Sequence, residues 1–187
     1  MSKRRTWILE AAVRVIARDG VRGLRVEELA AAAEVSTALI YYHFRDRAGL
    51  LRAALDHVNQ RAVSYTDAEL GDGDPRSRVR AMVLAELHAG DDVHDNSVAW
   101  GELRASAVFH EDLREPLRTT TEAWIADLAV LIGCATGTST GSGIDAAERL
   151  TALVEGLSQR WHSGTVTLER ARELLDAAVG LELGERD

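Results

Sequence analysis

The sequence predicts an all-α fold on three observations. Alanine and leucine are abundant, whereas only two prolines occur in 187 residues. Apolar residues recur at helical spacing through most of the chain. Glycine follows several of these segments, and serine, threonine or proline precedes others, as is typical of helix ends. We therefore expect about nine helices, arranged as an N-terminal three-helix module and a larger C-terminal helical body.

Composition restricts the class of protein. With 46% hydrophobic and 28% charged residues, the chain reads as an ordinary globular protein. Its single cysteine, Cys134, excludes an intrachain disulfide and a cysteine-based metal cluster, and fits a reducing cytoplasm. No apolar run approaches the roughly 18 residues of a membrane span, and no signal-peptide core is visible. We expect a cytoplasmic protein with no membrane partner.

The charge is distributed unevenly along the chain. The formal net charge is −8. Residues 1–60 hold 10 lysines and arginines against 7 acidic residues, whereas residues 61–187 hold 12 against 23. A mildly basic head on an acidic body suits a protein that meets DNA with one end only, although surface charge also drifts by chance.

Helical periodicity and end signals give the order of the elements. We predict a DNA-binding domain over residues 1–46, a linking helix over about 46–69, and a ligand-binding and dimerisation domain over 70–187. The segments 90–96 and 133–143 are polar or glycine-rich and are predicted as loops. The predicted helices are 5–18, two short helices within 26–44, 46 to beyond 65, 75–89, 97–109, 116–132, 144–162 and 167–183.

The stretch 26–44 has the parts of a helix-turn-helix. Small and apolar residues at helical spacing allow a close crossing, and Val35 fills the angle between the two helices. Ser36 supplies a hydroxyl that can cap the second helix. That second helix presents hydroxyl and aromatic groups, which a recognition helix needs for contacts with phosphates and base edges.

Residues 5–55 also resemble the TetR family of transcriptional regulators. The matching elements, in order, are Ile8-Leu9-Glu10-Ala11-Ala12, Gly20, Leu29-Ala30, Val35-Ser36, Ile40-Tyr41-Tyr42-His43-Phe44, Arg47 and Leu50-Leu51. The resemblance implies a homodimer that binds double-stranded DNA at a palindromic operator and responds to a small molecule. Four positions depart from the family pattern: Glu34 replaces a glycine, Arg25 a threonine, Arg47 a lysine, and Leu39 a small or hydroxylic residue.

The candidate DNA contacts lie in and beside the predicted recognition helix. Tyr42 and His43 are the main candidates for base or phosphate contact, and Arg25 can reach a phosphate. Tyr41 fits either a DNA contact or helix packing. The full set is Arg25, Ser36, Thr37, Leu39, Tyr41, Tyr42, His43 and Arg47.

The candidate effector site draws on aromatic, sulfur-containing and titratable residues of the body, because ligand pockets are mostly apolar with a few polar anchors. In the family's arrangement Trp100 and Trp124 flank a cavity beneath the linking helix. Taken singly, each aromatic residue among them is better explained as a core residue than as a pocket wall. The candidates are Met82, His88, Trp100, Arg104, Phe109 and Trp124.

The last two predicted helices carry wide apolar faces, which favour a four-helix bundle with a twofold copy. The alternative is that the protein's own body covers both faces. The candidate interface residues are Leu153, Leu157, Trp161, Leu174 and Leu175. The segments around Trp100, Trp124 and 153–161 are similar to the C-terminal domain of BetI-like regulators, which supports the fold and the dimer more than a particular ligand.

Enzyme signatures are missing from the sequence. No His-Glu-x-x-His, Gly-x-Ser-x-Gly or phosphate-loop pattern occurs, so we expect neither a metal nor a cofactor. We interpret the chain as a DNA-binding regulator, with release by an effector as the leading hypothesis. The alternatives are a ligand-independent or activating regulator and, more remotely, a helical protein-interaction module or a small helical enzyme.

Overall fold

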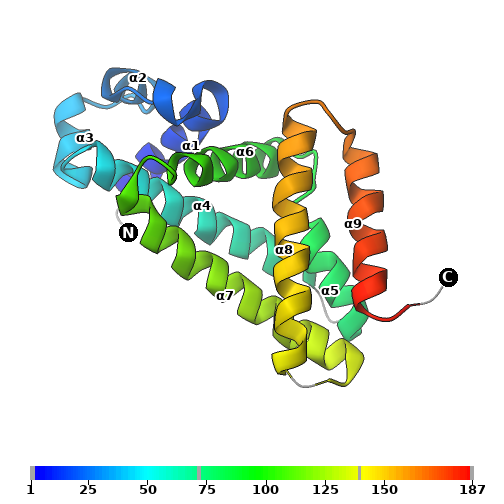
Figure 1. The fold of residues 1–187 in the computed structure, drawn as a ribbon. Coiled ribbons are helices and arrows are strands. Elements are labelled where there is room, and N and C mark those ends of the chain that lie inside the picture. The colour runs from blue at the N-terminus through cyan, green and yellow to red at the C-terminus, as the bar shows by residue number, and fades with distance from the viewer. Residues whose placement is uncertain (1–2, 71–72, 139, 186–187) are drawn as a thin grey trace. The chain divides into compact units, whose positions relative to one another are not determined.

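A computed structural model describes residues 3–70, 73–138 and 140–185, without the side chains of 67–70 and 140–142. Within these ranges nine α-helices and no strand are found, which confirms the all-α fold (Figure 1). The chain divides into two compact units. Unit 1 comprises residues 1–61 and 95–118, and unit 2 comprises residues 62–94 and 119–187.

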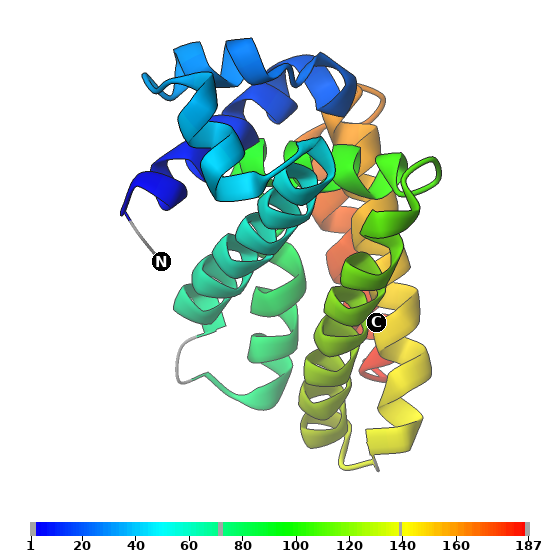
Figure 2. The same cartoon turned by 90° about the vertical axis from the view of Figure 1, so that its left-hand side faces the viewer.

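Unit 1 begins with α1 (Lys3–Gly23), whose buried face includes Ile8, Leu9 and Ile16. The helix is interrupted at Gly20, where φ is 72°. The expected end of the first helix at Gly20 is therefore confirmed as a break, after which one more turn follows. Helices α2 (Val26–Ala32) and α3 (Thr37–Phe44) come next and appear in blue to cyan in Figure 2.

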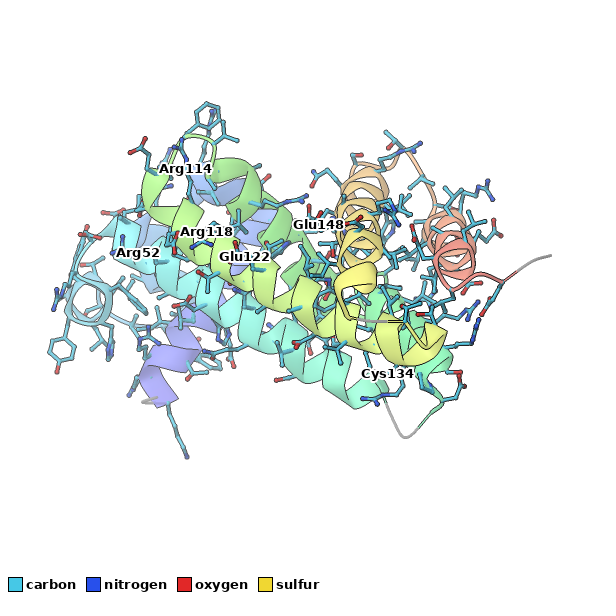
Figure 3. The ribbon with its side chains drawn as sticks, turned by 60° about the horizontal axis from the view of Figure 1, so that its bottom comes forward. Arg52, Arg114, Arg118, Glu122, Cys134 and Glu148 are labelled. Atoms are coloured by element: carbon cyan, nitrogen blue, oxygen red, sulfur yellow. The ribbon has the colours of Figure 1, made fainter. Side chains whose placement is uncertain are left out.

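Three further helices supply the rest of unit 1, each of them divided between the units along its length. They are α4 (Arg47–Leu70), α6 (Asp91–Ser106) and α7 (Glu111–Thr136). Arg52 of α4 pairs with Asp112 of α7 at 3.1 Å, and Arg114 donates to the carbonyl oxygens of Ala107 and Val108 after α6 (Figure 3). One apolar cluster of unit 1 joins α1–α4 to α6 and to the start of α7.

Unit 2 is built around α5 (Pro75–Leu84), α8 (Thr140–His162) and α9 (Leu168–Glu182). Helices α8 and α9 lie side by side, and α5 packs against both (Figure 1). Two ends follow the sequence signals: Asp74 caps α5 with Pro75 in its first turn, and Thr167 accepts the Arg170 N–H at 3.2 Å to cap α9.

Salt bridges connect the helices of unit 2 at their surface. Arg80 of α5 pairs with Asp176 of α9 at 2.9 Å and also with Glu185. Arg149 of α8 pairs with Glu182 of α9 at 2.7 Å. Each exposed ion pair of this kind adds little to the free energy of unfolding. Most of the stability of unit 2 therefore comes from the apolar cluster that includes Leu128, Leu150 and Leu175.

Two helices begin earlier than the sequence patterns indicated. The predicted loop 90–96 is wrong, because α6 starts at Asp91, and α7 starts at Glu111 so that Pro116 lies inside it. Both helices carry two acidic residues in the first turn, which the positive end of the helix dipole stabilises. These charged starts looked like solvated loops in the sequence.

Two other boundaries also needed correction. The helix predicted over 75–89 ends at Leu84, where Arg172 donates to the Leu84 and Leu87 carbonyl oxygens. The loop predicted over 133–143 is wrong on both sides, because α7 continues to Thr136 and α8 starts at Thr140; residue 139 lies outside the described residues. Gly143 is there for packing, since a Cβ would lie 2.7 Å from the Ala129 carbonyl oxygen.

Candidate DNA-binding surface and effector pocket

The helix-turn-helix of unit 1 forms as its residues predict. Val35 is half-buried against the unit 1 cluster, between α2 and α3. Ser36 accepts the Leu39 N–H at 3.3 Å and caps α3. Glu34 adopts a φ of 52°, a left-handed conformation that costs a non-glycine residue about 1 kcal/mol. Arg25 precedes α2 without a side-chain cap, as expected.

The exposed face of α3 is polar and aromatic. Thr37 is exposed, Tyr42 is 80% exposed, and Tyr41 is 50% exposed, so Tyr41 is not a core ring. The inner face consists of Ile40 and Phe44, which are buried. Tyr42 and His43 contact each other edge to face, with ring centroids 5.2 Å apart. This helix therefore offers hydroxyl groups to a partner while its other face holds it to unit 1.

Two of the candidate DNA-contacting residues also make contacts within the protein. Leu39 is half-buried and packs against the unit 1 cluster. Arg47 donates to the Val21 carbonyl oxygen, which connects the start of α4 to the end of α1. Arg45 was not predicted as a DNA contact, although it is an exposed cation directly after α3 with a φ of 63°. Its place beside the aromatic motif was the available signal.

Helix α3 and helix α4 approach each other closely at Gly49. A Cβ on Gly49 would lie 2.2 Å from the Phe44 carbonyl oxygen, far inside van der Waals contact. Asp46 accepts the Gly49 N–H at 2.7 Å and stabilises the first turn of α4. The recognition helix is therefore seated directly on the backbone of the next helix.

We expect Gly49→Ala to lower the free energy of unfolding by about 1–3 kcal/mol, because the backbone must shift to admit the methyl group. The shift would also move α3 and weaken operator binding. Urea denaturation and gel-shift titrations measure the two effects. Gly180→Ala in α9 is the control, since its Cβ would make only an ordinary contact, 3.4 Å from Glu185. Equal stability of the Gly49→Ala protein and the parent would contradict this view.

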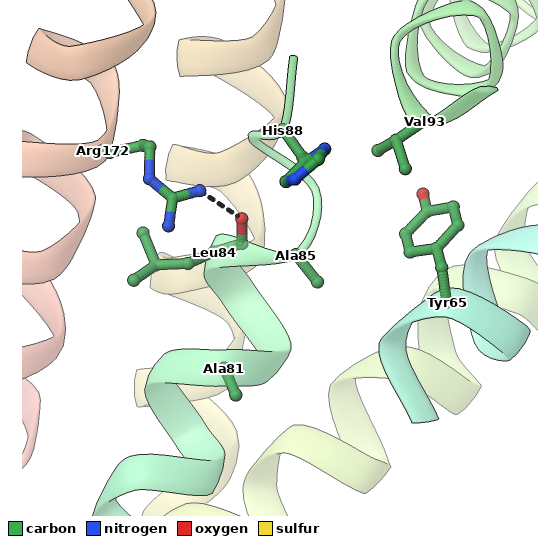
Figure 4. A pocket seen from close by; sticks show the side chains of 7 residues that line it. All are labelled: Tyr65, Ala81, Leu84, Ala85, His88, Val93 and Arg172. Atoms are coloured by element: carbon green, nitrogen blue, oxygen red, sulfur yellow. Dashed lines mark hydrogen bonds between the residues drawn. The ribbon is translucent and has the colours of Figure 1, made fainter. Parts of the chain in front are cut away.

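Unit 2 contains a pocket of about 180 Å³ beside the last turn of α5. Figure 4 shows its side chains, which come from α4, from α5 and the turn after it, from the start of α6 and from α9. The lining residues are Tyr65, Ala81, Leu84, Ala85, His88, Val93 and Arg172. The walls are apolar except for the tyrosine, the histidine and the arginine.

A carboxyl group lies next to this pocket. Glu86 accepts the Tyr65 hydroxyl at 2.9 Å. Burial raises the pKa of Glu86 to about 7, and the hydrogen bond from Tyr65 opposes that rise. Elsewhere in unit 2, burial lowers the pKa of His162 to about 4, with His94 adding to the effect. The Glu86 carboxyl thus changes charge near neutral pH.

Only one of the six predicted effector residues, His88, lines this pocket. Met82 is 4% exposed in the unit 2 core, and Phe109 is 76% exposed at the turn after α6. Trp100 and Trp124 are partly buried, in unit 1 and unit 2 respectively. Burial lowers the pKa of Arg104. Tyr65, Glu86 and Arg172 were not predicted from the sequence. Arg172 falls at helical spacing with Leu168 and Leu175, and its charge on an apolar stripe was the available signal.

The predicted interface residues divide into two groups. Leu157 and Leu175 are 3% and 0% exposed within the protomer's own core, so the expectation of free apolar surface at these two positions is wrong. Leu153, Trp161 and Leu174 are half-buried. The exposed surface of α8 and α9 includes small and apolar residues at helical spacing: Ala152, Gly156, Ala177 and Leu181.

Glu86→Gln is expected to gain stability relative to the parent as pH rises. In the parent the folded state keeps its proton up to about pH 7, whereas the unfolded carboxyl loses it near 4.5. The folded state therefore binds more protons in this window, and its free energy of unfolding falls with pH by at most about 3 kcal/mol. Urea denaturation at pH 5 and pH 8 measures the difference between the two proteins.

The comparison isolates Glu86 from the histidines, whose lowered pKa values act in the opposite direction below about pH 6.5 in both proteins. Glu148→Gln makes the same substitution at an exposed position of α8 (Figure 3) and serves as the control. A stability difference between Glu86→Gln and the parent that does not change with pH would contradict the burial of a titrating carboxyl.

A capped helix-turn-helix with an exposed polar recognition helix, followed in the chain by a larger helical unit, defines a class of DNA-binding protein. Comparison with protein families agrees. The family of bacterial regulatory proteins of the tetR type matches residues 8–54, and the C-terminal domain of BetI-type transcriptional repressors matches residues 75–184. The chain belongs to the TetR family of transcriptional regulators, with a C-terminal domain of the BetI type.

Individual relatives match along nearly the whole chain. A TetR-family protein from Rhodococcus sp. has a crystal structure with 45% identity and a TM-score of 0.86, over 98% of this chain and 100% of that one. The HTH-type transcriptional regulator BetI of Proteus mirabilis is 26% identical, over 97% of this chain and 92% of its own. A transcriptional regulator from Saccharomonospora viridis, solved in complex with choline, is 26% identical with a TM-score of 0.81, over 95% of each chain.

Members of this family are transcriptional regulators and not enzymes, so the resemblance of residues 5–55 and the regulator assignment are confirmed. In the described part of the chain no group of three metal-ligating side chains occurs. The described helices include none with the length and apolar character that a bilayer crossing needs.

Proposed function

We propose that the protein is a homodimeric repressor that binds a palindromic operator and is released from it by a small molecule. The supporting observation is the exposed face of α3, where Thr37 and Tyr42 are exposed on a helix capped by Ser36. A recognition helix of this kind enters the major groove, and a twofold pair of them reads two half-sites about one DNA turn apart. The regulator would meet this DNA in the cytoplasm.

The proposal assigns a role to each part of the chain. Residues 1–46 form the DNA-binding domain, the helix over about 46–69 links it to the body, and residues 70–187 bind the effector and a second copy. On the DNA side we assign phosphate contacts to Arg25 and Arg45, both exposed. The relative that was solved with choline supports a small-molecule effector in general, without fixing its chemistry.

For the dimer we propose the exposed surface of α8 and α9, with Leu153, Trp161 and Leu174 at its margin. Small residues at 152 and 156 would let a second helix approach closely. Effector binding would then change the separation of the two recognition helices, by preferring one of two states of the dimer.

Gel shifts with DNA from around the protein's own gene test the function. We expect one protein dimer per palindrome, much weaker binding to a single half-site, and an affinity that falls steeply with salt. Scrambled DNA of the same length is the control. Binding that ignores sequence, or binding to half-sites as tight as to the palindrome, would contradict the proposal.

A further inference from the structure

The pocket of unit 2 has a polar lining that consists mainly of hydrogen-bond donors. Arg172 uses Nη1 for the carbonyl oxygens of Leu84 and Leu87, so Nε and Nη2 keep their donor capacity (Figure 4). His88 accepts the Gly90 N–H on Nδ1 at 2.9 Å, which leaves the proton of the neutral ring on Nε2 as a donor. Both side chains line the pocket.

The charge of Arg172 is not neutralised within the described part of the chain. Arg172 donates to two backbone carbonyl groups, and the acidic neighbours on α9 are engaged elsewhere: Glu173 pairs with Arg170, and Asp176 pairs with Arg80. A half-buried guanidinium without a carboxylate attracts an anion, because the low dielectric of the pocket strengthens the pairing.

The remaining walls set the size and polarity of the ligand. Ala81, Leu84, Ala85 and Val93 give an apolar lining, and the volume of about 180 Å³ is smaller than that of pockets for drug-sized ligands. The small side chains of Ala81 on α5 and of Ala85 directly after it keep the space open. A ligand that fits has one anionic end and a short aliphatic chain.

We propose that this pocket binds a small aliphatic monocarboxylate, held by Arg172 and His88, and that this carboxylate is the effector. The carboxylate takes the free donors of both side chains, and the aliphatic chain of the ligand lies along Ala81 and Ala85. A quaternary ammonium ion such as choline does not fit this site, because it would face the guanidinium. The ligand class therefore differs from that of the choline-bound relative.

Isothermal titration calorimetry of the full-length protein, without DNA, tests the site with hexanoate, hexanamide and choline. Hexanoate should bind saturably, and hexanamide about tenfold to a hundredfold more weakly, because it lacks the charge-assisted hydrogen bonds. Choline should not bind in this pocket. Equal affinity for hexanoate and hexanamide, or no binding of hexanoate, would overturn the proposal.

Substitutions in the pocket test whether hexanoate binds there. Arg172→Gln should reduce hexanoate affinity by about tenfold or more, while Arg170→Gln, the same change at an exposed pair on α9, should leave it unaltered. Because Arg172 also holds the turn after α5, Ala81→Leu provides a second test: it fills the pocket and keeps the arginine. Ala105→Leu, at an exposed position of α6, is its control. Undiminished hexanoate binding by Ala81→Leu would exclude this pocket.

The role as effector rests on the proposed repressor function and is measured separately. Hexanoate should release the parent protein from its operator in gel shifts, and should fail to release the Ala81→Leu protein. Binding without release would contradict the role of the carboxylate as effector, whereas absence of operator binding by the unliganded protein would contradict the repressor function itself.

Discussion

A Gly156→Arg protein is expected to be a folded monomer with little affinity for the operator. Gly156 lies on the exposed surface of α8, and a Cβ there would meet nothing within 4 Å in the protomer. Replacing a glycine inside a helix stabilises the helix by about 1 kcal/mol, so the substitution should not lower the stability of the protomer itself. In a twofold seam, however, two unpaired arginines would be buried at a cost of several kcal/mol.

Light scattering checks the mass, with twice 20.4 kDa expected for the parent and 20.4 kDa for the variant. Gly156→Ala is the matched control and should remain dimeric, with a small gain in stability. Leu157→Arg is a poorer probe, because Leu157 belongs to the protomer's own core and its replacement would unfold the chain. If the Gly156→Arg protein were still a dimer, the dimer interface would have to lie elsewhere than at this part of α8.

The double variant Thr37→Ala, Tyr42→Ala is expected to lose operator affinity without losing stability. Each contact with a base or phosphate is worth about 1–3 kcal/mol, so the pair should weaken binding by tenfold at the least. Both side chains are exposed, and surface substitutions of this kind change the free energy of unfolding by about 0.5 kcal/mol or less. Gel-shift titrations and thermal unfolding measure the two quantities.

Phe109→Ala and Thr119→Ala remove an aromatic ring and a threonine hydroxyl at exposed positions outside the helix-turn-helix, and should bind the operator like the parent. The salt dependence distinguishes the contacts further, because Arg45→Ala should flatten it, whereas the double variant should not. If the double variant bound the operator as tightly as the parent, the proposed contact between α3 and DNA would be wrong.

Local signals in the sequence were sufficient where one residue determines a helix end. Ser36 and Thr167 each cap the helix that their hydroxyl predicts, Pro75 lies in the first turn of α5, and Gly20 interrupts α1 by its positive φ. The helix-turn-helix was predictable for the same reason: its turn, cap and apolar spacing lie within 20 residues. Sequence periodicity is reliable at this range because the contacts are local.

Long-range contacts explain what the sequence did not reveal. The end of α5 depends on Arg172, which lies 88 residues after Leu84, and no local pattern reports such a pair. The burial of Leu157 and Leu175 depends on how many helices share one core, so their apolar spacing alone did not separate core from interface. The pocket likewise combines residues that lie between positions 65 and 172, and only the charge of Arg172 on an apolar stripe indicated it.

The contact between Gly49 and the Phe44 carbonyl has a mechanical consequence. No side chain separates the end of α3 from the first turn of α4, so a small movement of one is transmitted directly to the other. Arg47 clamps the same turn to the Val21 carbonyl oxygen. Within unit 1, a displacement of the first turn of α4 would therefore move α3 with it.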